Sequence, residues 1–181
     1  MKMIHIMTGA VNSGKTTRMK NLLQRVPAAD GVLSEKTFEG ACFHGYRLTH
    51  AASGEWRELA LLEEFYSGRF PVAGRFGPYV FSRKAFRFAR EILMRLAVDD
   101  GTRAIFLDEA GPLELRGEGF SDVIHLLLAC EKDIYITVRS SCLERFLTQF
   151  GITEYVLLPL SERSDQFCLK NDRRVPEGFG L

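Results

Sequence analysis

Gly9-Ala10-Val11-Asn12-Ser13-Gly14-Lys15-Thr16-Thr17 satisfies G-x-x-x-x-G-K-[ST], the Walker A pattern of a phosphate-binding loop. The residues before it, 3–7, form a short, mostly apolar run of the kind that a buried parallel strand requires. After it, apolar residues at 19, 22, 23 and 26 have the spacing of one helix face, and Pro27 predicts the end of that helix. The order strand, loop, helix is the local setting that the pattern needs.

This loop predicts a site for the phosphates of a nucleotide, formed by residues 9–17. Glycines let successive N–H groups and the helix N-terminus point at one phosphate, to which the positive end of the helix dipole adds. Lys15 is expected to reach the outer phosphates, and the Thr16 hydroxyl to bind Mg²⁺, which prefers oxygen ligands. Thr17 is either helix surface or a further phosphate contact.

Length and composition predict one soluble domain spanning residues 1–181. Lys and Arg number 24 against 23 Asp and Glu, a net charge of +1, so no overall field attracts nucleic acid or membrane. The four cysteines lack metal-site spacing, and no apolar run is long enough to span a membrane. We expect a cytoplasmic protein, a monomer or weak oligomer, with no protein partner identified by the sequence.

Apolar periodicity and turn residues predict the remaining elements. Partial alternation around Glu39-Gly40 predicts an antiparallel hairpin. Ser82 is the expected N-cap of a long amphipathic helix that Asp99-Asp100-Gly101 closes, with the glycine left-handed. A capping box at Ser141-Cys142-Leu143-Glu144 predicts another helix, which ends at Gly151. The expected strands are 3–7, 32–38, 42–48, 56–59, 102–109, 133–138 and 153–158, with helices around 19–26, 82–98 and 120–128, loops at 75–81 and 110–115, and a candidate edge strand at 166–169.

Strands alternating with helices predict an α/β protein whose parallel sheet is covered on both faces. We expect the strand before the phosphate-binding loop to be central. A second strand, 102–109, is expected to lie one neighbour away from it and to end in carboxylates near the loop.

That second strand has the form of a Walker B strand, because an apolar run ends in Asp108-Glu109. Its aspartate is expected to hold Mg²⁺, and Glu109 to act as general base toward water. An Asp-Glu pair at a strand end is also common in exposed turns, but the Walker A loop favours the catalytic interpretation.

Arg139 follows the next strand and therefore reaches the same edge of the sheet, where open α/β sheets bind ligands. There it is a candidate to stabilise the charge of a transferring phosphoryl group, although the position also suits a solvated loop arginine. Arg75 and Arg163 are weaker candidates for this task. Glu114 is expected either to support the site or to lie on the surface.

Order and spacing of these segments resemble the THEP-type nucleoside triphosphatases, which are related to the cancer-related nucleoside triphosphatase of animals. The run from Asp108 to Leu115, with the pattern Asp-Glu-x-Gly-x-x-Glu-Leu, is the most specific part of the resemblance. The other shared segments are 9–17, 31–35, 38–40, 45–48, 74–77 and Phe120.

The resemblance implies a three-layer P-loop NTPase fold with a central, mostly parallel sheet of the RecA-like type, to which the hairpin prediction adds a small antiparallel meander after the first helix. It implies slow, Mg²⁺-dependent hydrolysis of nucleoside triphosphates such as ATP or GTP, with loose base selectivity. By position, Lys15 and Thr16 bind phosphate and Mg²⁺, Asp108 holds Mg²⁺, and Glu109 activates water. A small-molecule or nucleoside kinase, and a nucleotide-gated binding module with slow hydrolysis, remain alternative functions of the same loop.

Overall fold

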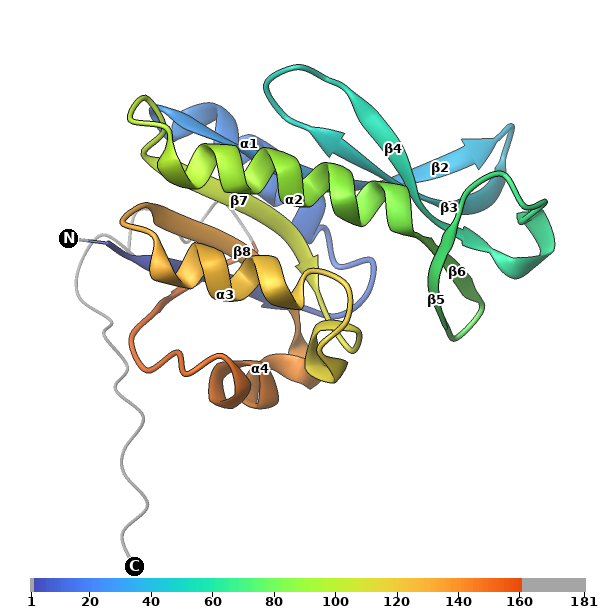
Figure 1. Ribbon diagram of the computed structural model, residues 1–181. Helices are drawn as coiled ribbons and strands as arrows, with labels where there is room; N and C mark the ends of the chain where they lie inside the picture. The colour runs from blue at the N-terminus through green and yellow to red at the C-terminus, as the bar shows by residue number, and fades with distance from the viewer. Residues whose placement is uncertain (1, 161–181) are drawn as a thin grey trace, which may run out of the picture.

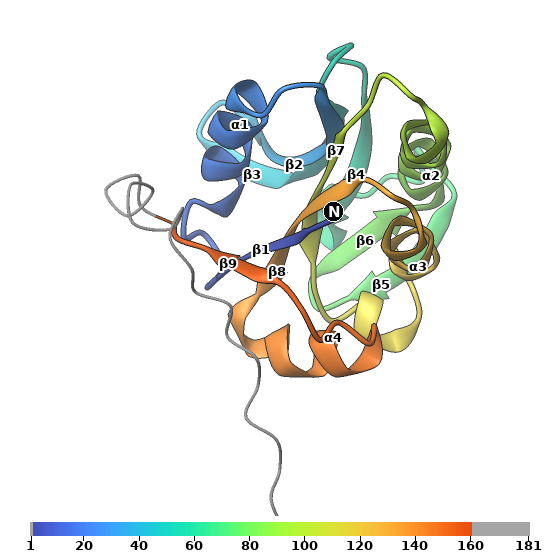
Figure 2. The ribbon, with the colours of Figure 1, turned by 90° about the vertical axis from the view of Figure 1, so that its left-hand side faces the viewer.

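In the computed structural model, the described residues, 2–160, form one nine-stranded sheet with helices on both faces (Figures 1 and 2). The sheet order is β5-β6-β4-β3-β2-β7-β8-β1-β9. The strands are β1 (Ile4–Gly9), β2 (Ala29–Glu39), β3 (Cys42–His50), β4 (Trp56–Leu62), β5 (Val72–Phe76), β6 (Tyr79–Ser82), β7 (Ala104–Ala110), β8 (Asp133–Arg139) and β9 (Val156–Leu158). The α-helices are α1 (Lys15–Arg25), α2 (Arg83–Val98), α3 (Ser121–Ala129) and α4 (Leu143–Gln149).

The strands from β2 to β9 in this order run parallel, and β3, β4, β6 and β5 extend the sheet as antiparallel strands. This arrangement confirms the predicted α/β fold with a parallel central sheet and an antiparallel meander after the first helix. In Figure 1 the antiparallel strands project beyond the helices as a wing.

Alternation along the parallel strands divides the core between the two faces of the sheet. On β1, Ile6 belongs to the larger cluster with residues of α2 and α3, whereas its neighbour Met7 packs in a smaller cluster with Met19 of α1. Figure 2 shows α1 alone on one face and α2 and α3 on the other. Successive strand side chains point to opposite faces, so each apolar run contributes to both layers.

The position of the P-loop strand was predicted incorrectly. β1 lies between β8 and β9 and is the second strand from one edge of the sheet, not a central one. The other half of the prediction is confirmed, because β8 separates β1 from β7. The middle strand of the nine is β2, and even among the five parallel strands β1 is the fourth, after β2, β7 and β8.

The segment 75–81 was also predicted incorrectly, as a loop. It contributes to the antiparallel hairpin of β5 and β6, whose turn at Gly77-Pro78 has glycine at φ 56°. The strand expected at 56–59 extends to Leu62. The strand candidate at 166–169 lies outside the described residues.

Four helix ends test the capping predictions. Ser82 Oγ accepts a hydrogen bond from Ala85 N and caps α2, as predicted. At the other end, the prediction for Gly101 is wrong: α2 ends at Val98 with an extended Asp99, and Gly101 does not have a positive φ. The capping box at 141–144 is wrong as well, because Ser140–Cys142 forms a 3₁₀ turn and α4 has no side-chain cap. Gly151 follows α4 at φ 63°, as predicted.

Candidate functional site

The Walker A loop connects β1 to α1 and curls around the Lys15 ammonium. Gly14 has φ 90°, a left-handed conformation that favours glycine, and a Cβ at Gly9 would lie 2.5 Å from Ser13 Oγ and would displace that side chain. Lys15 Nζ donates to the carbonyl oxygens of Gly9 at 3.1 Å and Ala10 at 2.7 Å. Burial lowers the pKa of Lys15, against the opposing attraction of nearby carboxylates.

Asp108, a residue of β7, is hydrogen-bonded to Thr16 of the Walker A loop. The carboxylate is 1% exposed, and its Oδ2 accepts hydrogen bonds from Thr16 Oγ1 at 2.6 Å and from Ser34 N at 3.2 Å. Its Oδ1 accepts a hydrogen bond from Thr137 Oγ1 at 2.7 Å. Burial raises the pKa of Asp108 to about 6, although the hydroxyl donors oppose this shift. The two motifs thus meet directly at the Thr16 hydroxyl.

Glu109 has an unusual backbone for a residue with a side chain, with φ 75°. The register between β7 and β8 shifts between Leu107 and Ala110, which marks an irregularity at the two carboxylates. The Glu109 amide donates to Thr137 Oγ1 at 2.7 Å, and its Oε1 accepts hydrogen bonds from Arg139 Nη2 at 3.1 Å and Nε at 3.3 Å. A left-handed residue breaks the strand alternation that would point the two carboxylates to opposite faces.

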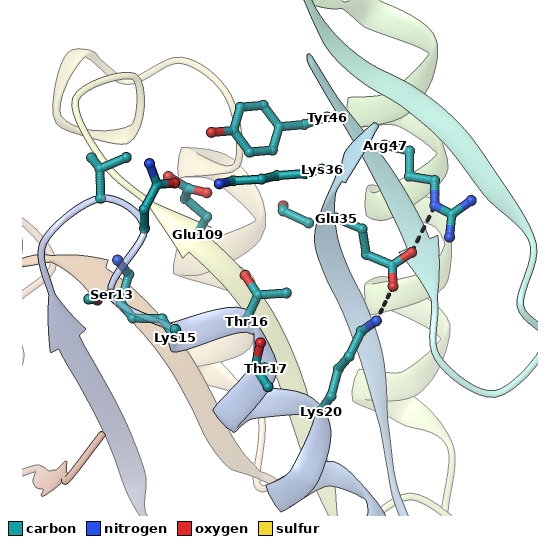
Figure 3. Close-up of a pocket in the computed structure, with 14 residues that line it drawn as sticks. Ser13, Lys15, Thr16, Thr17, Lys20, Glu35, Lys36, Tyr46, Arg47 and Glu109 are labelled. Atoms are coloured by element: carbon teal, nitrogen blue, oxygen red, sulfur yellow. Dashed lines mark hydrogen bonds and ion pairs between the residues drawn. The ribbon is translucent and has the colours of Figure 1, made fainter. Parts of the chain in front are cut away.

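A pocket of about 430 Å³ lies in front of the loop (Figure 3). Its volume is in the range of small-molecule sites. Seven consecutive residues of the predicted loop line it, Val11 to Thr17, and so does Glu109. Gly9 and Ala10 lie behind Lys15, and Asp108 lies behind Thr16. The pocket thus joins the predicted loop to the predicted base.

The far wall of this pocket was not predicted from the sequence. That wall consists of residues from α1, β2 and β3, namely Lys20, Ser34, Glu35, Lys36, Tyr46 and Arg47. In the sequence, most of these residues belong to the polar end of the predicted hairpin that follows the first helix. No local sequence pattern indicates that this hairpin passes in front of the loop. Four cations line the pocket against two carboxylates, a balance that suits a polyphosphate.

Glu35 organises the far wall. It forms an ion pair with Lys20 of α1, and its Oε2 accepts hydrogen bonds from Arg47 Nε at 2.8 Å and Thr49 Oγ1 at 2.7 Å. Burial raises the pKa of Glu35, but the hydrogen bonds from Lys20, Thr49 and Arg47 outweigh it and hold the pKa at about 2. Helix α1 and strand β3 are therefore tied together through one carboxylate.

Replacing this carboxylate, Glu35→Gln, is expected to lower the free energy of unfolding at pH 7 by about 1 kcal/mol. The folded pKa is below the usual 4.5, so this stabilisation is full above pH 4.5 and disappears as the pH falls toward 2. Urea unfolding of both proteins at pH 7 and at low pH measures the difference. A difference that stays the same down to pH 2 would show that the charge of Glu35 contributes nothing.

A second, smaller pocket of about 50 Å³ lies behind Glu109. Aromatic side chains, including Tyr46 and Tyr79, line it together with Arg139 and Glu114. Glu114 is 3% exposed, which excludes the surface position and leaves the other alternative, that it supports the site. Its Oε2 accepts a hydrogen bond from Gly111 N at 2.7 Å and its Oε1 one from Phe120 N at 3.1 Å, which fixes the loop after the Walker B strand.

Burial raises the pKa of Glu114 to about 7, against the opposing backbone hydrogen bonds. Because the folded pKa is above the usual 4.5, the folded state binds more protons, and stability falls as the pH rises from 4.5 to 7. We expect Glu114→Gln to remove the contribution of Glu114 to the slope of the unfolding free energy against pH. It also turns an amide NH₂ toward one backbone N–H, which costs about 1–3 kcal/mol. Unfolding free energies measured from pH 4.5 to 8 should show the largest difference between the two proteins at the acidic end, and equal slopes would contradict the assignment.

The three candidate arginines lie in different places. Arg139 is bound to Glu109 and lines the smaller pocket rather than the larger one. Arg75 lies on the exposed hairpin and pairs with Glu63 at 3.2 Å, outside the lining of both pockets. Arg163 lies outside the described residues.

These features place the protein in the class of P-loop nucleotide-binding α/β proteins. A comparison with protein families extends this assignment: residues 4–164 match the model of a family described as NTPase. The chain therefore belongs to the NTPase family, and it is an enzyme of the hydrolase class.

Proteins named nucleoside-triphosphatase THEP1 resemble the chain in sequence, which confirms the resemblance noted from the motifs. The protein from Thermotoga petrophila is 28% identical over 171 residues, covering 91% of this chain and 88% of that protein. The protein from Thermococcus kodakarensis is 26% identical over 179 residues, covering 96% of this chain and 95% of that protein.

Two solved structures share the fold. The crystal structure of THEP1 from Aquifex aeolicus has a TM-score of 0.68 at 21% identity and covers 92% of this chain and 95% of that one. The solution structure of a human cancer-related nucleoside triphosphatase has a TM-score of 0.65 at 19% identity and covers 91% of each chain. Among the described helices, none is both long and apolar enough to cross a membrane.

Proposed function

We propose that this protein hydrolyses nucleoside triphosphates to nucleoside diphosphates and inorganic phosphate in the larger pocket, with Mg²⁺ and with loose selectivity between ATP and GTP. The observation that carries the proposal is the position of Glu109, a carboxylate that lines the same pocket as the Walker A loop. Membership in the NTPase family and the names of the relatives support the same reaction.

Thr16 and Asp108 fit Mg²⁺. The carboxylate is buried, and its hydrogen-bond donors from Thr16, Ser34 and Thr137 are all neutral, so its negative charge is not balanced by a bound cation side chain. A hydroxyl next to a carboxylate supplies the oxygen ligands that a hard divalent cation prefers. When bound there, Mg²⁺ would neutralise negative charge on the phosphate oxygens.

We assign the remaining roles from the contacts. The N–H groups of residues 9–17 and the Lys15 ammonium bind the phosphate oxygens. Glu109 accepts a proton from the attacking water, which is general-base catalysis. Thr137 and Arg139 hold the backbone and the carboxylate of Glu109, so Arg139 contributes by orienting the base.

On the side of Glu109 that faces away from the larger pocket, the free volume suits water and not a larger phosphoryl acceptor. The smaller pocket, at about 50 Å³, is far below the roughly 300–1,000 Å³ of ligand sites, whereas a water molecule needs only about 10–15 Å³. A sugar or nucleoside acceptor has no comparable space on that side of the base. Hydrolysis is therefore preferred over the kinase alternative.

The test is phosphate release from ATP, GTP, CTP and UTP, each with Mg²⁺ and with a chelator. We expect release from more than one nucleotide with Mg²⁺ and none above background with the chelator. Absence of release from all four with Mg²⁺ would rule out the proposed function. Phosphate transfer to an added nucleoside or sugar, in place of free phosphate, would establish the kinase instead.

A further inference from the structure

Lys36 extends into the larger pocket from the wall opposite the Walker A loop. Strand β2 pairs with β7 only over residues 29–32 and then continues past it into the antiparallel wing. Ser34, whose amide donates to Asp108, lies where β2 passes the Walker B carboxylate. Lys36 follows two residues later on the same strand face, about 7 Å further along β2 at the usual rise of a strand.

Figure 3 shows the Lys36 side chain extended from β2 into the pocket, beside the ring of Tyr46 and pointing toward Glu109. Lys36 pairs with Tyr46 in the β2–β3 register, and its ammonium lies 5.9 Å from the centroid of the Phe43 ring. Aromatic neighbours bind an ammonium weakly and reduce its contact with water on one side. The lysine therefore lies between an apolar wall and the space where a triphosphate would bind.

The other cations near the pocket already have partners. Lys20 and Arg47 are bound to Glu35, Arg139 is bound to Glu109, and Lys15 donates to carbonyl oxygens of the loop. Among residues 2–160, Lys36 has no carboxylate within ion-pair distance. An anion that enters the pocket can engage this ammonium without first breaking an ion pair.

We propose that Lys36 is a catalytic cation that stabilises the transferring γ-phosphoryl group from the side opposite Lys15. The inference rests on the proposed hydrolysis and assigns to Lys36 the charge-stabilising task that the sequence suggested for Arg139. In the reaction the water oxygen bonds to the γ-phosphorus and the bond from phosphorus to the β–γ bridging oxygen breaks. The nucleoside diphosphate leaves, and Glu109 takes the proton of the water.

The reason is electrostatic. Negative charge spreads over the three equatorial oxygens of the phosphoryl group in the transition state, so cations on the loop side alone, Lys15 and the proposed Mg²⁺, leave the oxygen on the opposite side uncompensated. A lysine ammonium is a compact charge on a flexible stem and can follow an oxygen that moves as the phosphorus inverts. Stabilisation that is stronger in the transition state than in the ground state raises kcat more than it tightens substrate binding.

The experiment compares Lys36→Gln and Lys36→Arg with the wild type, and uses Lys84→Gln as a matched control because Lys84 is exposed on α2, away from both pockets. We expect Lys36→Gln to lower kcat by about 10²–10³-fold, the usual effect of losing one transition-state donor. The Kd of ADP should change less than about threefold, because ADP lacks the γ-phosphoryl group. Lys36→Arg should restore part of kcat, and Lys84→Gln should match the wild type.

A second readout does not depend on turnover. ADP with aluminium fluoride and Mg²⁺ imitates the transferring phosphoryl group, so Lys36→Gln should weaken this complex by a factor similar to the loss in kcat, while ADP alone binds as before. Unchanged kcat and unchanged aluminium fluoride affinity in Lys36→Gln would overturn the inference. Equal losses for ADP and for the aluminium fluoride complex would also overturn it, since they indicate general phosphate attraction.

The outcomes separate this inference from the proposed function. Suppose that the wild type hydrolyses nucleotides, that Glu109→Gln does not, and that Lys36→Gln has the wild-type kcat. The proposed hydrolysis is then retained and the proposed role of Lys36 is rejected. If the wild type releases no phosphate from any nucleotide with Mg²⁺, both the proposed hydrolysis and the proposed role of Lys36 are rejected.

Discussion

Glu109→Gln is expected to lower kcat for phosphate release by about 10²–10⁴-fold, the usual contribution of a positioned general base. Glutamine has nearly the same shape and can still accept a hydrogen bond from Arg139, but it cannot take a proton from water. The Kd for nucleoside triphosphate should stay within about threefold of the wild type, because the Walker A loop is unchanged. Single-turnover phosphate release and equilibrium titration measure the two quantities.

Glu118→Gln is the matched control, since Glu118 is exposed in the loop before α3 and lines neither pocket. It should hydrolyse nucleotides at the wild-type rate. Hydrolysis by Glu109→Gln at more than about a tenth of the wild-type rate would mean that another group, or the phosphate itself, takes the proton.

Lys15→Ala is expected to weaken the binding of nucleoside triphosphate by about 10²-fold or more and to abolish hydrolysis at ordinary substrate concentrations. The substitution removes the charge nearest the outer phosphates and also leaves the Gly9 and Ala10 carbonyls without their side-chain donor. A nucleotide present at 100 times the wild-type Kd stabilises the wild type by about 2.7 kcal/mol, and this gain should nearly vanish in the variant. Thermal unfolding with and without nucleotide detects it.

Lys2→Ala provides the control for loss of a lysine near the N-terminus, because Lys2 donates to carbonyls of α3 and lies outside the pocket lining. Its unfolding temperature should rise with nucleotide as the wild type's does. Wild-type nucleotide stabilisation in Lys15→Ala would place the phosphates somewhere other than the Walker A loop.

Local features explain which parts of the site the sequence could predict. The Walker A loop requires particular residues at fixed spacing between a strand and a helix, and residues 4–25 contain that whole unit. Asp108 was identifiable because a strand buried on both faces is a nearly continuous apolar run that ends abruptly in a carboxylate. Asp108 then meets Thr16, 92 residues earlier, because β7 and β1 are parallel strands of one sheet.

The far wall of the pocket depends on strand pairings that no local pattern reveals. Lys36 and Tyr46 enter the pocket because β2 continues past β7 and carries β3 with it. The hairpin of β5 and β6 was missed for a different reason: its turn residues, Gly77-Pro78, lie in the middle of a short segment that therefore looked like a loop.

The conformation of Glu109 was beyond sequence reasoning as well. A left-handed residue in a strand is expected to be glycine, or less often asparagine or aspartate, and a glutamate there gives no signal. The surrounding contacts from Thr137 and Arg139 hold it in place. Such a backbone costs about 1–3 kcal/mol, and here it is found at the residue proposed as the base.

In the proposed reaction, water activated in this pocket attacks the γ-phosphorus of a nucleoside triphosphate. Hydrolysis of ATP in ¹⁸O-labelled water, followed by mass spectrometry of both products, shows where the oxygen of that water goes. We expect one ¹⁸O atom from water in each released phosphate and none in ADP, with Glu109→Gln slowing the appearance of labelled phosphate by the same factor as kcat. Label in ADP, or ATP consumed without labelled phosphate, would contradict the proposed reaction.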